Sequence, residues 1–146
     1  MTPFNYRLEQ VLRYRKQLEE TAILALAKAE ERRVKTREHI ARIESESAKL
    51  VHEKEKYASL EPGERYVLVA YEQALRAEKE SALIRLAQQE LEVDARRQEL
   101  VKKAQERSLL DKLKEKQAKR HAVQELLHEQ RTNDETATLR FSPAAF

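Results

Sequence analysis

The sequence predicts an all-α protein in which two long helices fold back on each other as an antiparallel coiled-coil hairpin. Charged residues make up 38% of the 146 residues and aromatic residues only 5%, so too little apolar material is present for a large globular core. Residues 4–58 and 65–131 contain neither Gly nor Pro and are rich in the strongest helix formers. The only Gly of the chain, Gly63, follows Pro62 between these segments, and the pair marks the reversal.

The hairpin is expected to occupy residues 1–138 as a single domain. The first helix is predicted at about 3–58, the turn at 59–64, the second helix at about 65–135, and a flexible tail at 139–146. Thr2 is expected to cap the first helix, with Pro3 at its first position. Gly63 is expected to adopt a left-handed conformation in the turn. One continuous helix kinked at residue 62 is the alternative, but it leaves its apolar stripe without a partner.

Apolar residues spaced alternately three and four apart predict the seam of the coiled coil. In the first helix the predicted seam comprises Phe4, Leu8, Val11, Arg15, Leu18, Ala22, Ala25, Ala29, Arg32, Thr36, His39 and Ile43, then Leu50 and Tyr57. In the second helix it comprises Val67, Ala70, Ala74, Ala77, Ser81, Ile84, Gln88, Leu91, Ala95 and Gln98, then Leu109, Val123 and Leu126. If the chain folds at about residue 62, residue i should lie opposite roughly residue 124 − i.

Basic residues are concentrated in the two segments that the hairpin brings together at its open end. Residues 1–16 hold four basic residues against one acidic residue, and residues 102–120 hold eight against three. These segments carry net charges of +3 and +5, whereas the whole chain carries only +3. The uneven distribution indicates two different partners, and an ordinary solvated helix surface is the alternative.

The sequence predicts neither an enzyme nor a cofactor site. A single Gly cannot supply a Gly-rich phosphate-binding loop, and the absence of Cys excludes a thiolate metal site. His121 and His128 are two helical turns apart, about 10 Å, which is too far to share a metal. His52 and His128 are expected to be solvated. No segment is long and apolar enough for a membrane span or a signal peptide, so we expect a soluble protein.

Two segments of the chain resemble a known family. Residues 4–30, FNYRLEQVLRYRKQLEETAILALAKAE, resemble the opening of the FliJ family of flagellar type III export proteins. Residues 106–120, ERSLLDKLKEKQAKR, are similar to the carboxy-terminal signature of that family, and the pair Asp134 and Glu135 fits its trailing acidic pair. The resemblance covers essentially the whole chain, including the central break.

The resemblance implies a non-enzymatic coiled coil similar to that of the gamma subunit of ATP synthase. It implies a central stalk and activator of the hexameric flagellar export ATPase, which also contacts the membrane export gate protein and the export chaperones. The expected location is the cytoplasm, with peripheral association at the inner membrane, and the expected state in isolation is a monomer.

By position, the resemblance implies two sets of binding residues. The candidate ATPase-binding residues are Tyr6, Arg7, Leu8, Val11, Leu12, Arg15, Leu109, Leu110, Leu113, Lys116 and Gln117. Leu8 and Val11 lie on the predicted seam and can instead hold the hairpin together, whereas Leu12, Leu110 and Leu113 lie off it and are expected at the surface. The candidate gate-binding residues are Ile43, Leu50, Tyr57, Tyr66, Tyr71 and Leu75, although Tyr57 continues the seam and can be buried.

Three other functions remain open on the sequence. A nucleic-acid-associated protein could use the basic residues 102–120, but acidic residues interrupt them and no aromatic platform accompanies them, so no nucleic acid is expected. A generic coiled-coil scaffold could pair two chains in trans. A stalk homologue from an injectisome could have the same architecture.

Overall fold

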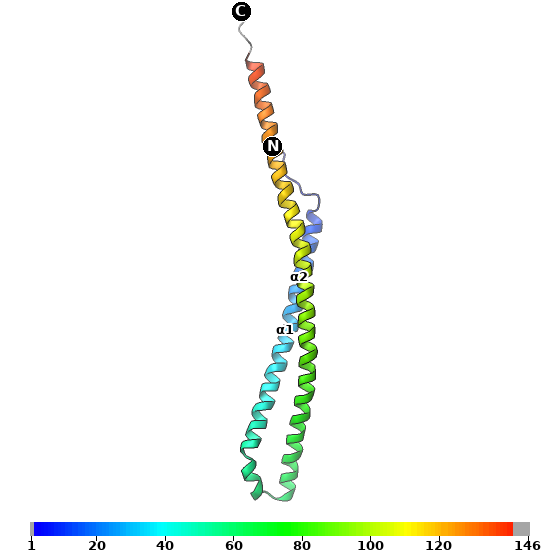
Figure 1. Ribbon diagram of the computed structural model, residues 1–146, viewed down its shortest axis with the longest axis vertical. Coiled ribbons are helices and arrows are strands. Elements are labelled where there is room, and N and C mark those ends of the chain that lie inside the picture. Colours follow the sequence, from blue (N-terminus) through cyan, green and yellow to red (C-terminus); the bar gives the residue numbers. More distant parts are fainter. Residues whose placement is uncertain (1, 142–146) are drawn as a thin grey trace, which may run out of the picture. The chain divides into compact units, whose positions relative to one another are not determined.

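The protein consists of two long helices and a short connection between them. The computed structural model describes residues 2–141, without the side chain of residue 55. Helix α1 spans Glu9–His52, the 3-10 helix η1 spans Lys54–Ser59, and helix α2 spans Pro62–Arg140 (Figure 1). The part of the chain that the structure describes contains no strand. The predicted fold class is therefore confirmed.

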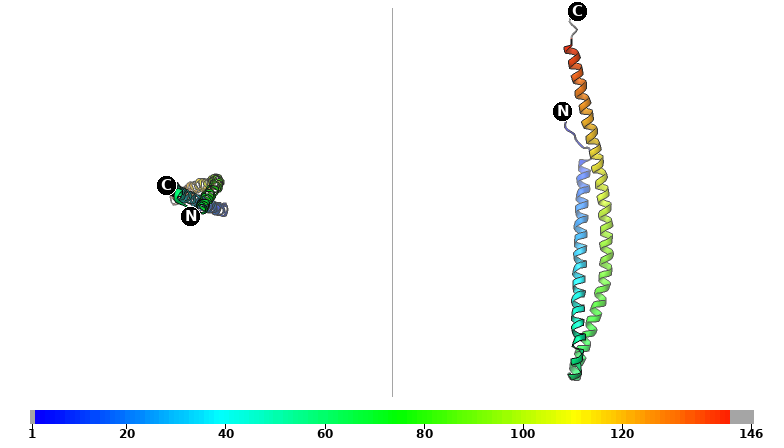
Figure 2. Two further views of the ribbon diagram at one scale, coloured as in Figure 1. Left: turned by 90° about the horizontal axis from the view of Figure 1, so that it is seen from below. Right: turned by 60° about the vertical axis from the view of Figure 1, so that its left-hand side comes forward.

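The chain forms two compact units. The terminal unit comprises Met1–Glu20 and Lys102–Phe146, and the turn unit comprises Thr21–Val101. Within each unit a segment of α1 runs antiparallel to a segment of α2, and the connection between the helices closes the turn unit (Figure 2). The single hairpin domain over residues 1–138 stays a prediction.

Helix α1 begins at Glu9 and not at the predicted residue 3. Thr2 therefore does not cap the helix, and its hydroxyl donates a hydrogen bond to the carboxylate of Glu125 at 2.5 Å. The first bond into the helix region runs from the Glu9 N–H to the Tyr6 carbonyl, at 3.1 Å. At the other end of the chain, α2 continues to Arg140, so the first two residues of the predicted tail are helical. Residues 142–146 of that tail lie outside the described residues.

The connection between the helices differs from the predicted turn. Gly63 is not in a left-handed conformation; it lies in the first turn of α2, directly after Pro62. Pro62 opens the helix, where its missing N–H costs no hydrogen bond. The reversal falls on the extended backbone of Leu60, whose N–H donates to the Tyr57 carbonyl at 3.2 Å. The Arg65 guanidinium also donates to the Ala58 carbonyl, at 2.8 Å, and so ties α2 to the end of η1.

The seam of the turn unit is narrow and contains polar residues. Its buried members on α1 are Ala22, Ala29, Thr36, Ile40 and Ile43, and those on α2 are Leu75, Ala82 and Val93. Thr36 satisfies its hydroxyl by donating to the Arg32 carbonyl, at 3.1 Å. The prediction was right for Ala22, Ala29, Thr36 and Ile43. At the seam positions between these residues the prediction was one residue too early. For example, Ile40 is buried, whereas the predicted His39 is only half-buried.

The predicted seam of α2 was wrong. All ten residues predicted between 67 and 98 are exposed, and so are Leu109, Val123 and Leu126. The stripe that faces α1 contains charged residues, such as Lys79, whose ammonium group pairs with the Glu44 carboxylate at 3.3 Å. A long side chain of this kind packs its aliphatic stem in the seam and places its charge at the edge. A prediction that places every charged residue at the surface therefore misses the stripe of α2 that faces α1.

The predicted register is confirmed by ion pairs between the helices. Arg32 pairs with Glu92 at 3.2 Å, where 124 − i gives residue 92. Arg37 pairs with Glu90 at 3.0 Å, and Arg97 pairs with Glu30 at 3.3 Å. Because these pairs lie at the edges of the seam, they fix the register but contribute little stability individually.

Candidate protein-binding faces

The segment that precedes α1 lies against α2 in the terminal unit. We call residues 2–8 the N-terminal strap. The Tyr6 side chain is buried, and its hydroxyl donates to the Leu110 carbonyl at 3.1 Å. The Phe4 ring contacts the His121 ring, with centroids 5.6 Å apart. These contacts hold the strap along α2, and they explain why the chain does not begin the helix at residue 3.

Ion pairs connect α1 to α2 in the terminal unit. Arg15 pairs with Glu106 at 2.7 Å, and Lys114 pairs with Glu9 at 2.8 Å. Arg107 contacts the carboxylates of both Glu19 and Asp111. Several basic residues of the two charged segments thus serve the pairing of the helices and are not available to a partner.

These contacts shift the pKa of groups at the edge of the seam. The hydrogen bond from Lys114 lowers the pKa of Glu9, because it stabilises the charged carboxylate. Hydrogen bonds to Asp111 and Glu19 raise the pKa of the Arg107 guanidinium. The hydrogen bond from Thr2, supported by the nearby His121, lowers the pKa of Glu125.

The candidate ATPase-binding residues divide into inner and outer side chains. Tyr6 and Leu12 are buried; Arg15, Leu110 and Gln117 are half-buried; Arg7, Leu8, Val11, Leu109, Leu113 and Lys116 are exposed. The expectation that Leu12 lies at the surface was wrong, since its exposed fraction is 0%. Conversely, Val11 was expected on the seam and is 43% exposed. The seam passes through Leu12, so Val11 lies beside the seam.

Several exposed residues share one side of the terminal unit. Val11 directly precedes the seam residue Leu12, and Leu113 directly precedes Lys114, which contacts Glu9. In an antiparallel pair of helices, residues in these positions flank the same edge of the seam. We call this side the terminal face, and its members are Val11, Tyr14, Leu109, Leu113, Lys116 and Arg120, all exposed.

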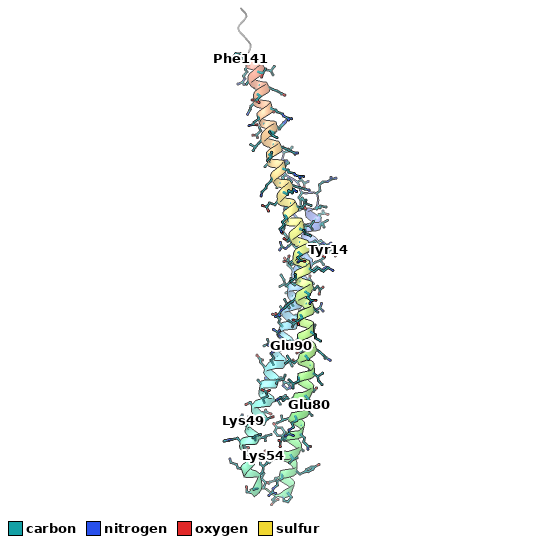
Figure 3. The ribbon with its side chains drawn as sticks, viewed as in Figure 1. Tyr14, Lys49, Lys54, Glu80, Glu90 and Phe141 are labelled. Carbon is teal, nitrogen blue, oxygen red and sulfur yellow. The ribbon has the colours of Figure 1, made fainter. Side chains whose placement is uncertain are left out.

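The terminal face combines apolar and unpaired basic side chains. Tyr14 projects from the surface of the terminal unit (Figure 3) and is 57% exposed. Among the described residues, Lys116 and Arg120 form no ion pair, and no acidic residue lies three or four positions from either of them. Sequence reasoning missed Tyr14 and Arg120. The alternating four-three spacing of residues 109, 113, 116 and 120 was the signal that could have found Arg120.

A shallow cavity of about 360 Å³ lies beside the N-terminal strap. It is lined by Thr2, Phe4, His121, Ala122, Glu125, Leu126 and Glu129. Two of its titratable groups are engaged with each other, since Glu125 accepts the Thr2 hydrogen bond and lies 3.8 Å from the His121 imidazole. No group of three or more potential metal ligands is present in residues 2–141.

The candidate gate-binding residues also divide between core and surface. Ile43 and Leu75 are buried in the seam of the turn unit, so their side chains are not available to a partner. Leu50 is half-buried, and Tyr57 packs beside it with its hydroxyl donating to the Leu50 carbonyl at 3.3 Å. Tyr66 is 77% exposed, which makes it the most accessible of the three tyrosines near the turn.

Tyr66 and Tyr71 do not form one cluster. The Tyr71 hydroxyl donates to the Glu46 carboxylate at 2.8 Å, and this hydrogen bond raises the pKa of Tyr71. Tyr71 therefore bridges α2 and α1 at one edge of the seam. Tyr66 lies five residues earlier on α2 and projects from another face of the helix, near the exposed Val69.

Comparison with known proteins identifies one family. A family model described as Flagellar FliJ protein matches residues 4–145. A comparison with curated proteins and a comparison with solved structures gave no match. Among the described residues, no helix is long and apolar enough to cross a membrane.

Proposed function

The chain belongs to the FliJ family of flagellar proteins, and on that premise we propose that it is the central stalk and activator of the hexameric flagellar export ATPase. Membership of the family makes the protein a component of the flagellar export apparatus. The proposal adds that the terminal unit enters the ATPase ring, as the coiled coil of the gamma subunit does in ATP synthase.

The observation that carries this proposal is the terminal face. It presents the apolar side chains of Val11, Leu109 and Leu113 together with the unpaired charges of Lys116 and Arg120. Exposed apolar residues rimmed by charges are typical of protein-binding surfaces. Beyond residue 129, α2 is exposed on every side up to Arg140, so this segment is also free to contact a ring.

For the turn unit we propose a different partner, the membrane export gate protein. We propose Tyr66 as the main gate-binding residue, since Ile43 and Leu75 are inside and Tyr57 is engaged with Leu50. A Tyr side chain supplies a large rigid surface and a polar tip, which favours it in interfaces. Contact with the gate would give the protein its peripheral association with the inner membrane, and export chaperones are further proposed partners.

The proposal assigns ATP hydrolysis to the partner and no cofactor to this chain. Its test is to mix the protein with the cognate flagellar export ATPase and to measure hexamer formation and ATP turnover. We expect stimulation of both. The double variant L109D/L113D should lose most of the stimulation, because it places two carboxylates on the terminal face.

Leu24→Asp is the matched control. Leu24 is an exposed leucine of α1 in the turn unit, outside the terminal face. Its variant should stimulate the ATPase as the unchanged protein does. Absence of stimulation by the unchanged protein would reject the stalk function, and equal activity of L109D/L113D would reject the terminal face as the binding surface.

A further inference from the structure

In the terminal unit, the stripe of α2 that faces α1 continues beyond the start of that helix. Lys114 pairs with Glu9 at 2.8 Å, and Glu9 is the first residue of α1. Beyond this point the N-terminal strap takes the place of α1 along α2, and α2 continues past the strap (Figure 1). The half-buried positions of α2 nevertheless recur at the same spacing, at residues 121, 125 and 129. These residues therefore lie beneath or beside the strap.

The strap and this part of α2 together form the shallow cavity of about 360 Å³, which we call the strap cavity. The Phe4 ring and the Leu126 side chain supply its apolar surface, and Glu125 and Glu129 supply carboxylates. The His121 ring contacts the Phe4 ring, with centroids 5.6 Å apart, and so holds that wall in place. Ligand-binding cavities typically have volumes of about 300–1,000 Å³, so the strap cavity can hold one long side chain.

The two carboxylates of the strap cavity differ in their partners. Glu125 accepts the hydrogen bond from the Thr2 hydroxyl, which lowers its pKa, so that it is charged at neutral pH. Glu129 is half-buried and pairs with no basic side chain among residues 2–141. No basic residue lies three or four positions from it on α2. A partly buried carboxylate without a counter-charge favours the binding of a cation.

The combination of a ring with carboxylates favours one kind of cation. A guanidinium group is planar, so it can stack on the Phe4 ring while the N–H groups at its edge donate to carboxylates. The ammonium group of lysine is more strongly hydrated and has no flat face. The aliphatic stem of an arginine can pack against Leu126. The strap cavity therefore favours arginine over lysine.

From these observations we propose that the strap cavity binds an arginine side chain that a protein partner presents. The guanidinium group pairs with Glu129 and stacks on the Phe4 ring. Leu126 is itself 62% exposed, so the rest of the partner has apolar surface to cover, which free arginine would leave in water. No residue of the strap cavity belongs to the terminal face, and the proposal does not depend on the proposed stalk function.

Titration of the isotope-labelled full-length protein with N-acetyl-arginine amide, followed by the NMR chemical shifts of backbone amides, tests the proposal. This arginine probe has capped ends, as an arginine within a polypeptide does. We expect saturable shifts with a Kd in the millimolar range, confined to the strap and to the part of α2 that lines the strap cavity. N-acetyl-citrulline amide has nearly the same shape without the charge and should bind about fivefold more weakly. N-acetyl-lysine amide, the lysine probe, should also bind more weakly than the arginine probe.

Two substitutions test the residues that the proposal names. E129Q should weaken binding of the arginine probe about fivefold, because it removes one partly screened ion pair. F4L keeps an apolar wall but removes the ring, so it should reduce the preference for the arginine probe over the lysine probe. E135Q is the matched control, since Glu135 is an exposed carboxylate of α2 outside the strap cavity, and it should leave the affinity unchanged. Circular dichroism should show that each variant keeps its helicity.

Four results would overturn the proposal or a part of it. Absence of saturable shifts would reject the site. Equal weakening by E129Q and E135Q would show that any surface carboxylate attracts the probe. Tighter binding of free arginine than of the capped probe would identify a site for the amino acid instead of a protein partner. If F4L keeps the full preference for the arginine probe, Phe4 does not contribute to the site.

Discussion

The Tyr6 hydroxyl donates a hydrogen bond to the backbone carbonyl of Leu110, 104 residues away in the sequence. Tyr6 precedes the first helix, and its ring is buried against α2. This contact fixes the N-terminal strap to the terminal unit and sets the point at which α1 begins.

Removal of the Tyr6 hydroxyl should loosen the strap without unfolding the protein. We expect Y6F to cost about 1 kcal/mol, because a typical buried hydrogen bond contributes about 0.5–1.5 kcal/mol. Hydrogen exchange of the amides in residues 105–125 measures this loss within the terminal unit. Tyr14 is exposed, so Y14F should leave the exchange rates unchanged.

The position of the seam on α1 can be tested with two adjacent residues. L12A should destabilise the terminal unit by about 2–5 kcal/mol, because Leu12 is fully buried. V11A should change the free energy of unfolding by less than about 0.5 kcal/mol, as is usual for a surface position. Urea unfolding followed by circular dichroism compares the two. If V11A lowers the free energy of unfolding more than L12A does, the seam passes through Val11, as the sequence predicted.

Two substitutions near the turn should have different effects, one on the stability of the protein and the other on its binding to the gate. Leu75 is buried, so L75A should lower the free energy of unfolding by about 2–5 kcal/mol. Tyr66 is exposed, so Y66A should leave unfolding almost unchanged but weaken binding to the cytoplasmic part of the export gate protein. Calorimetric titration of the gate fragment measures the binding. Normal gate binding by Y66A would remove Tyr66 from the proposed interface.

The pairing of Glu9 with Lys114 should depend on pH. The pKa of Glu9 is lowered from its ordinary value of 4.5 in the folded protein, so its charged form favours the folded state. The contribution is present above the ordinary pKa and is lost as the pH falls through the lowered pKa. E9Q should therefore reduce the loss of terminal-unit stability on acidification below about pH 4.5.

Hydrogen exchange of the terminal unit in a series of buffers measures this dependence. R7Q is the matched control, because Arg7 is an exposed basic residue of the same unit that forms no ion pair with Glu9. It should leave the pH dependence nearly unchanged. An E9Q profile identical to that of the unchanged protein would contradict the assignment.

Local sequence signals determined the secondary structure and the pairing of this chain. The long segments of strong helix formers specified α1 and α2, and Pro62 located the reversal to within a few residues. Register followed as well, as the pair of Arg32 with Glu92 shows, because a short connection leaves the helices almost no freedom to slide. Both features depend on interactions close in sequence or on chain geometry.

Tertiary structure alone decided which face of each helix is inside. On α2 two stripes have seam spacing, and the stripe through Leu91 is the less charged, yet the stripe through Val93 faces α1. That choice depends on aliphatic stems and ion pairs that only the opposite helix supplies, such as Glu44 for Lys79. Tertiary structure also decided the conformation of residues 2–8, because Tyr6 is buried against α2 and does not form the start of the helix. The sequence by itself therefore determined the helices and their register, whereas packing between them decided the seam, the N-terminal strap and the faces left for partners.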